Sequence, residues 1–137
     1  MLKLGYRGIT LMEIMVAVGV LAVTLVGLLA LFVNCLFLNE ASRNLTFASS
    51  HAQYVLEDVR NSAFADFTSL KTAINNGNWD WDSGEINAKG LIALKNEQID
   101  TQASDTNPLQ VTVLVTWKNN RGQDVNTSLN TKITNYQ

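Results

Sequence analysis

The strongest pattern in the sequence is an unbroken apolar run close to the N-terminus. Residues 14–33 carry no charge, and Thr24 is the only polar side chain among them. A helix of this length spans ~30 Å, which is the thickness of the hydrocarbon core of a bilayer. Lys3 and Arg7 precede the run and no acid occurs among residues 1–12, so the positive-inside rule places the N-terminus in the cytoplasm. The pattern predicts a single-pass membrane protein whose C-terminal part lies outside.

A second pattern extends the helix beyond the membrane-length run. No proline or glycine occurs between Leu28 and Ile74, and apolar or small residues recur at alternating intervals of three and four. This spacing predicts one helix with an apolar stripe, running from near Ile9 to near Asn61. A separate amphipathic helix after a loop and a coiled-coil dimer are the alternatives. The predicted stripe consists of Leu38, Ala41, Leu45, Ala48, Ala52, Val55 and Val59.

The last third of the chain alternates apolar and polar residues with the period of a β-strand. Residues 109–117 and 125–133 both follow this pattern. Between them, Asn120-Arg121-Gly122 suits a three-residue turn with its glycine in the left-handed conformation. Pro108 stands before the first of these strands, where it interrupts no ladder. The turn predicts a hairpin that pairs Trp117 with Val125, Val113 with Leu129, and Leu109 with Ile133.

A two-stranded hairpin is not stable alone in water, so its apolar face needs a cover. Residues 91–94 are a candidate for a further short strand, and residues 64–74 continue a helical spacing that ends at Asn75-Asn76-Gly77. The apolar stripe is the natural cover for the sheet. We therefore predict an α+β fold: a long N-terminal α-helix, half in the membrane and half external and amphipathic, packed on a small antiparallel β-sheet.

The composition of the chain and its single cysteine and histidine argue against several classes of function. The net charge of −2 argues against nucleic-acid binding through a basic surface. Cys35 is the only cysteine, so no intrachain disulfide can form. His51 is the only histidine, and we expect it at the surface or in an interface. Catalytic triads, phosphate-binding loops and Cys/His metal clusters have no counterpart in the sequence, so we expect neither an enzyme nor a cofactor.

Calcium is the one metal for which the sequence offers a candidate binding segment. Asn78, Asp80 and Asp82 alternate as ligands do at the start of an EF-hand loop. Ser83 then stands where the loop needs glycine, and Lys89 stands where it needs a bidentate glutamate. We therefore interpret residues 76–85 as a turn-rich loop with two packed tryptophans rather than as a calcium site.

The residues just before the apolar run carry the most specific signal. Thr10 and Glu13 form the pattern of a capping box, in which both side chains bind free amides at a helix start. A cut after Gly8 would add a second role, because it creates an α-amine on Ile9 and makes Glu13 the fifth residue of the product. A carboxylate in an apolar environment favours a cationic partner, and the amine of a neighbouring copy could supply it. The two roles are compatible.

The stretch Arg7-Gly8-Ile9-Thr10-Leu11-Met12-Glu13-Ile14 closely resembles the processing site of type IV pilins and type II secretion pseudopilins. The resemblance extends to Val33, about the first quarter of the chain. It implies cleavage by prepilin peptidase between Gly8 and Ile9, N-methylation of Ile9, and a role for Glu13 in the register of assembly. Thr10 accompanies Glu13 in this role.

The resemblance also implies an organisation and a location. Residues 1–8 would be a leader that is removed, 9–38 the transmembrane and assembly helix, and 39–137 an external, periplasmic domain with the ladle fold of pilins. The protein would lie in the inner membrane and then enter a pilus or pseudopilus. Its partners would be prepilin peptidase, other pilin or pseudopilin subunits, the inner-membrane assembly platform and the lipid bilayer.

Two features favour a minor subunit or pseudopilin over a major pilin. Ala30 stands near the usual proline of major pilins, and a single cysteine cannot form their C-terminal disulfide loop. Residues 51–61 loosely resemble the helix of minor subunits. The contrasting hypothesis is a single-pass membrane protein with a small external binding domain that never assembles.

Overall fold

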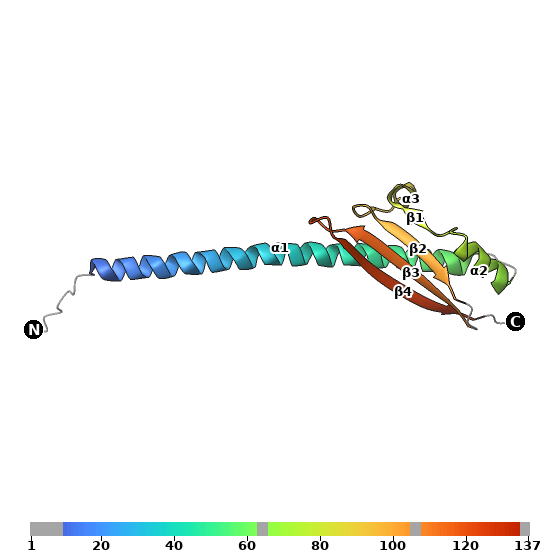
Figure 1. Cartoon of the computed structure of the whole chain (residues 1–137), viewed down its shortest axis with the longest axis horizontal. Helices are drawn as coiled ribbons and strands as arrows, with labels where there is room; N and C mark the ends of the chain where they lie inside the picture. Colours follow the sequence, from blue (N-terminus) through green and yellow to red (C-terminus); the bar gives the residue numbers. More distant parts are fainter. Residues whose placement is uncertain (1–9, 63–65, 105–107, 135–137) are drawn as a thin grey trace, which may run out of the picture. The chain divides into compact units, whose positions relative to one another are not determined.

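The computed structural model describes residues 10–62, 66–104 and 108–134. The chain divides into two units, residues 1–40 and residues 41–137. The described residues of the first unit belong to α1 from Leu11 onward, and the second unit contains all the strands of the described residues (Figure 1). In chain order the elements are α1 (Leu11–Asn61), α2 (Phe67–Asn75), β1 (Trp81–Asp82), α3 (Ser83–Ala88), β2 (Gln98–Ala103), β3 (Leu109–Lys118) and β4 (Asp124–Ile133).

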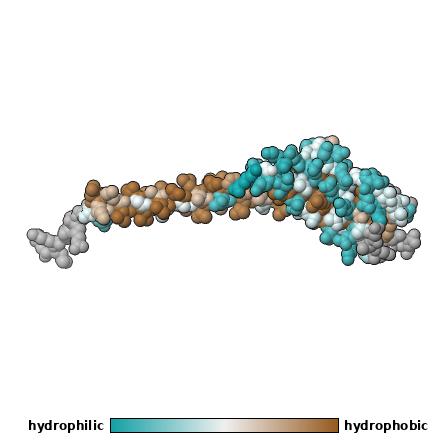
Figure 2. Space-filling view, viewed as in Figure 1, coloured by the Kyte–Doolittle hydropathy of each residue, from teal (hydrophilic) through white to brown (hydrophobic). Residues whose placement is uncertain are grey.

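Helix α1 is continuous over 51 residues, which confirms the prediction of one long helix. Its buried residues begin only at Ala48, and its apolar side chains in residues 11–39 are exposed. Within the described residues α1 is the one helix long and apolar enough to cross a membrane. Figure 2 shows this stretch as an almost unbroken hydrophobic surface. The separate-helix alternative is therefore wrong.

The four strands form one antiparallel sheet in the order β1-β2-β3-β4. The predicted hairpin is confirmed with its register, since all three expected pairs are partners in β3 and β4. Gly122 has a φ of 76°, a left-handed conformation that favours glycine over any residue with a Cβ. The turn and the hydrophobic pattern therefore select the same pairing.

One face of the sheet and one stripe of α1 form the core of the 41–137 unit. Every second residue of β3 is buried, and the half-buried inward residues of β4 pack against the same core. The buried side chains of α1 at this core are Ala48, His51, Ala52, Val55, Leu56 and Val59. Small alanines let the α1 backbone approach the sheet closely. The observed fold class is α+β, with a long helix packed on a small antiparallel sheet.

The predicted stripe on α1 is correct only from Ala48 onward. Leu38, Ala41 and Leu45 were expected to be covered, but all three are exposed. The spacing of three and four marks one side of a helix without saying how far along that side a sheet extends. Burial of the stripe therefore begins at Ala48, ten residues after the first residue of the predicted stripe, Leu38.

The segment between α2 and β3 departs from the sequence-based expectation. The strand predicted at residues 91–94 is wrong, because these residues lie in a loop whose amides bind side chains: Ala93 N–H donates to Asn87 Oδ1 at 3.3 Å and Leu94 N–H to Glu97 Oε2 at 2.6 Å. The next strand along the chain is β2, which was not predicted because only Ile99 and Thr101 of its residues are fully buried.

Residues 76–79 form a turn, as predicted for this segment, but residues 81–85 have regular secondary structure that was not predicted. They contain β1 and the start of α3, which opens with a complete capping box. Asp82 Oδ1 accepts from the amides of Gly84 and Glu85, and Glu85 Oε2 accepts from the amide of Asp82. The two tryptophans of this segment, Trp79 and Trp81, are buried as predicted.

Helix α2 connects α1 to this segment. Asp66 caps its N-terminus, since Oδ1 accepts from the Ser69 amide at 2.7 Å. The helix ends at Asn75, and Gly77 follows with a φ of 81°, so the predicted stop at Asn75-Asn76-Gly77 is confirmed.

Candidate membrane and assembly surface

The start of α1 is fixed by Thr10. Its Oγ1 accepts from the amide of Glu13 at 3.3 Å, and its carbonyl oxygen accepts from the amides of Glu13 and Ile14. This is the Thr10 half of the predicted capping box. The reciprocal bond, from the Thr10 amide to the Glu13 carboxylate, is not formed in the part of the chain that the structure describes. The Glu13 side chain is therefore left available for another partner.

Glu13 lies in an apolar setting. It borders a shallow hollow on the side of α1 whose other lining residues are Ile14, Ala17, Val18 and Leu21. A carboxylate costs ~2.5–3.5 kcal/mol at the centre of a bilayer even on insertion scales. The helix dipole favours an acid in the first turn and offsets part of this cost. A cation brought to the hollow would offset more of it.

Two of the residues implied by the resemblance, Gly8 and Ile9, lie outside the described residues. Cleavage between them, methylation of Ile9 and the leader at residues 1–8 therefore remain predictions. Of the sites singled out from the sequence, Thr10 and Glu13 are the pair that the structure brings into contact.

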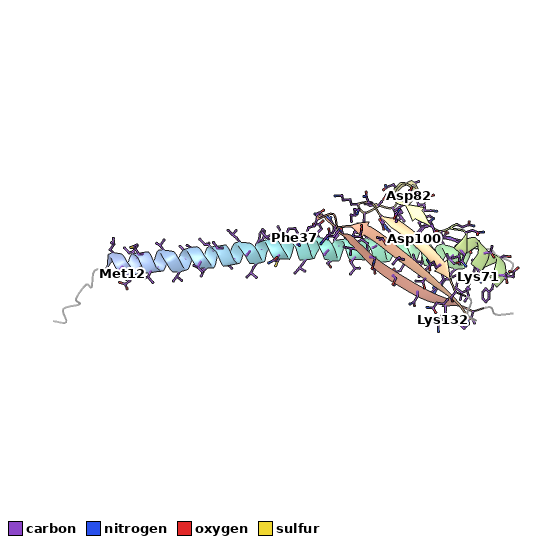
Figure 3. All side chains as sticks on the ribbon, in the orientation of Figure 1. Met12, Phe37, Lys71, Asp82, Asp100 and Lys132 are labelled. Atoms are coloured by element: carbon purple, nitrogen blue, oxygen red, sulfur yellow. The ribbon has the colours of Figure 1, made fainter. Side chains whose placement is uncertain are left out.

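The surface beyond Glu13 is apolar on all sides of the helix. The large apolar side chains from Leu11 to Leu38 are between 43% and 78% exposed. Figure 3 shows the Met12 and Phe37 side chains at the two ends of this stretch. Exposed apolar surface of this extent marks a membrane or protein contact. Cys35, near its end, is a free exposed thiol.

The 41–137 unit contains a buried polar contact that sequence reasoning missed. His51 was expected at a surface or interface, but it is 3% exposed, and its Nδ1 lies 2.8 Å from Oε1 of the fully buried Glu97. The expectation was wrong because His51 falls on the buried side of α1, one residue before Ala52 of the stripe. Its helical position beside Ala48 and Ala52 was the available signal.

The acids that suggested calcium are engaged in the fold. Asp80 Oδ1 accepts from the Thr101 amide at 2.7 Å, and Asp82 caps α3. Lys89, at the position of the missing glutamate, lies with Nζ 4.2 Å from the centre of the Trp81 ring. Among the described residues no group of three or more His, Cys, Asp or Glu side chains could hold a metal ion.

A polar hollow in the 41–137 unit has a volume of about 400 Å³. It lies beside the start of α3 and the adjoining ends of all four strands, with Asp82 of β1, Gln98 of β2, Lys118 of β3 and Asp124 of β4 in its lining. The charged groups on its walls already have partners: Asp82 caps α3, Lys118 Nζ lies 2.9 Å from Asp124 Oδ1, and Glu97 contacts His51. These contacts hold the strand ends together.

Comparison with known proteins gives no further assignment. No protein-family model, no curated protein and no solved structure matches this chain.

Proposed function

We propose that this protein is a structural subunit of a type IV pilus-like or type II secretion pseudopilus filament, with the ladle fold of pilins. It is made with a leader, cut by prepilin peptidase between Gly8 and Ile9, and held in the inner membrane with residues 39–137 in the periplasm. It then enters the filament through the apolar part of α1. A minor subunit or pseudopilin is the form that Ala30 and the single cysteine favour.

One observation carries this proposal: a helix begins directly after the Gly8-Ile9 pair with Thr10 as its cap, and Glu13 stands in an otherwise uncharged, uncovered apolar surface. A membrane anchor alone gains nothing from that carboxylate, because it raises the cost of insertion. An amine on Ile9 of a neighbouring copy would neutralise it. The same contact repeated head to tail generates a helical filament.

The α+β fold supports the proposal in a second way. The prediction of processing rests on residues 7–14, whereas the prediction of a helix packed on a sheet rests on periodicity in residues 38–133. The two are independent, and pilins combine these two features in one chain. Other proteins share the architecture, so the fold alone identifies no function.

Mass spectrometry of the protein from cells with an active prepilin peptidase tests the proposal. We expect a mature chain that begins at Ile9 and carries one added methyl group on its amine. Recovery of the full-length chain from such cells would favour the alternative, an unassembled single-pass membrane protein with a small external binding domain. A Gly8→Val variant is the control, since it should remain uncut.

A further inference from the structure

The segment that joins α3 to β2, residues 89–97, carries the most exposed large apolar side chain among the described residues of the 41–137 unit. Ile92 is 71% exposed, whereas Leu45, Tyr54 and Leu114 are between 37% and 47% exposed. Leu91 and Leu94 on either side are half-buried and pack against the core. We refer to this segment as the 89–97 loop.

The 89–97 loop is held in place by buried contacts. The Leu94 amide donates to Glu97 Oε2 at 2.6 Å, and the other carboxylate oxygen of Glu97 contacts His51 of α1. Asn96 has a φ of 51°, a left-handed conformation that is uncommon for a residue with a Cβ and persists where the surroundings enforce it. The loop is therefore anchored at residues 94–97, and the exposed Ile92 lies between Leu91 and Leu94, which pack on the core.

The loop lies at the end of the sheet where α1 enters the 41–137 unit. Its Glu97 contacts His51 of α1, whereas Arg60, further along α1, donates to Thr131 near the end of β4. The Lys118 amide donates to the Lys95 carbonyl at 2.9 Å, which joins the loop to the end of β3. Figure 1 shows the α3–β2 and β3–β4 connections at the same end of the sheet.

Two lysines flank the apolar part of the loop. The stretch from Lys89 to Lys95 contains no acid and reads Lys-Gly-Leu-Ile-Ala-Leu-Lys. The Lys89 ammonium lies over the Trp81 ring, and Lys95 is exposed. The neighbouring acids Asp82, Glu97 and Asp124 are engaged in the cap, the buried pair and the Lys118 ion pair. In the sequence of the loop, the exposed Ile92 thus lies between two cations.

We propose that the 89–97 loop docks on an anionic lipid bilayer surface, with Ile92 in the headgroup layer and Lys89 and Lys95 against lipid phosphates. Exposed apolar residues flanked by lysine are the combination that binds the membrane interface, because the two act on different layers of it. This inference rests on the membrane placement of α1 within the proposed function, and goes beyond it by assigning a lipid contact to the external domain.

A fluorophore on the loop tests the contact in the full chain. With Cys35→Ser as background, an environment-sensitive dye is attached to Ile92→Cys, or to Ser128→Cys on the exposed face of β4 as the matched control. The chain is reconstituted in phosphatidylcholine vesicles with or without phosphatidylglycerol. We expect a blue shift and quenching by lipid-borne nitroxide at position 92 only, stronger with phosphatidylglycerol. Each of Lys89→Gln and Lys95→Gln should lower the docked-to-undocked ratio about fivefold.

Two results would overturn the proposal. One is a dye at position 92 that iodide in water quenches as fully as a dye at position 128 in both kinds of vesicle. The other is a blue shift that depends on the protein-to-lipid ratio and not on phosphatidylglycerol, which would assign Ile92 to a contact between subunits. A dye on the native Cys35 reports insertion of α1 separately. A lipid-embedded label there with a water-exposed label at 92 overturns the loop proposal alone, whereas exposed labels at both positions overturn the membrane placement too.

Discussion

His51 and Glu97 are separated by 46 positions, yet their side chains meet inside the 41–137 unit with Nδ1 and Oε1 2.8 Å apart. Both side chains are buried, and the second carboxylate oxygen accepts from the Leu94 amide. Three segments are joined through these atoms: α1, the 89–97 loop and, through the Ser83 hydroxyl bound to the Glu97 carbonyl, the start of α3. Because the contact is buried, loss of one partner leaves the other without compensation.

We expect Glu97→Ala to lower the free energy of unfolding by ~3 kcal/mol, the lower end of the cost of removing one partner from a buried pair. Urea unfolding of the full chain in detergent micelles, followed by tryptophan fluorescence, measures the change. Glu57→Ala is the control, because Glu57 is exposed on the same helix as His51, and it should cost less than ~0.5 kcal/mol. Equal effects of the two substitutions would contradict a stabilising role for the buried pair.

The coupling within this pair is a separate prediction. His51→Ala and Glu97→Ala should be non-additive, with an interaction energy of ~1–3 kcal/mol in a double-mutant cycle. The reason is that each substitution removes the same contact, so the second removes only what the first has left. Additive effects would mean that each side chain acts through other neighbours.

The alanines of the stripe give a test of close packing. Ala52 is fully buried in the core, so Ala52→Leu should overpack it and cost ~1–3 kcal/mol of unfolding free energy. Ala41 was predicted on the same stripe but is exposed, and Ala41→Leu should change stability by less than ~0.5 kcal/mol. The same urea experiment compares them. A large cost at Ala41 would mean that the cover extends further along α1 than described.

Alanine substitutions at two glycines distinguish the cost of backbone strain from the cost of a side-chain clash. Gly77 and Gly122 both have positive φ, so alanine at either should cost ~1 kcal/mol or more. An added Cβ at Gly77 would lie 2.9 Å from Asp80 Oδ2, whereas at Gly122 it meets open space. The other oxygen of Asp80 binds the Thr101 amide, so movement away from the clash weakens that bond. We expect Gly77→Ala to be the more destabilising of the two in thermal unfolding.

The pKa of Asp66 should lie below its ordinary value of 3.8, first because the Ser69 amide donates to the carboxylate and then because the Ser69 hydroxyl does. A lowered pKa means that the cap stabilises α2 above the unfolded value and that this contribution is lost as the pH falls through the folded pKa. Acid below about pH 4 should therefore loosen α2. Carboxyl NMR titration measures the pKa directly.

Ser69→Ala is the variant for this titration. It should raise the pKa of Asp66 part of the way, because the hydroxyl is lost and the backbone amide remains. Thr68→Ala should leave that pKa unchanged, since Thr68 acts through its backbone. A pKa that does not respond to Ser69→Ala would show that the backbone amides of Ser69 and Thr68 account for the whole shift.

The parts of the fold that could be predicted are those in which one pattern decides the structure. The register of β3 and β4 follows from a turn and an alternation that agree, and α1 follows from a long stretch without breakers. The strand at residues 91–94 failed because a short apolar run fits a half-buried loop equally well. Strand β2 was missed because its inward positions include Thr101, whose hydroxyl donates to the Trp79 carbonyl and so compensates its burial.

Some contacts of the functional residues could likewise be predicted from the sequence, and others could not. Thr10 and Glu13 could be identified because a cap is a local contact between residues three apart. The His51–Glu97 contact could not be paired from sequence, because it depends on how a loop returns to α1. The position of His51 beside Ala52 indicated burial but not the partner. The sequence of residues 89–97 contains no pattern that marks Glu97 as the partner of His51.

The role of Glu13 in assembly gives the last prediction. Glu13→Ala should leave cleavage after Gly8 intact, because the Thr10 cap and the apolar run remain, and should reduce incorporation into filaments by about a hundredfold. We expect this effect because the ion pair lies in a water-poor interface, where loss of the carboxylate leaves the amine buried without a partner. That loss costs ~3 kcal/mol of assembly free energy, which corresponds to about a hundredfold. The mature chain in the membrane fraction and in sheared filaments measures the two steps separately.

Two further variants identify what Glu13 contributes. Glu13→Gln keeps the shape and removes the charge, so it should assemble as poorly as Glu13→Ala if the pair with an amine is what matters. Glu40→Gln removes a carboxylate from α1 beyond the apolar surface and should assemble normally. Normal assembly of Glu13→Gln would mean that a hydrogen bond or packing, and not charge, sets the register. Loss of cleavage in either Glu13 variant would instead place the residue in recognition by the peptidase.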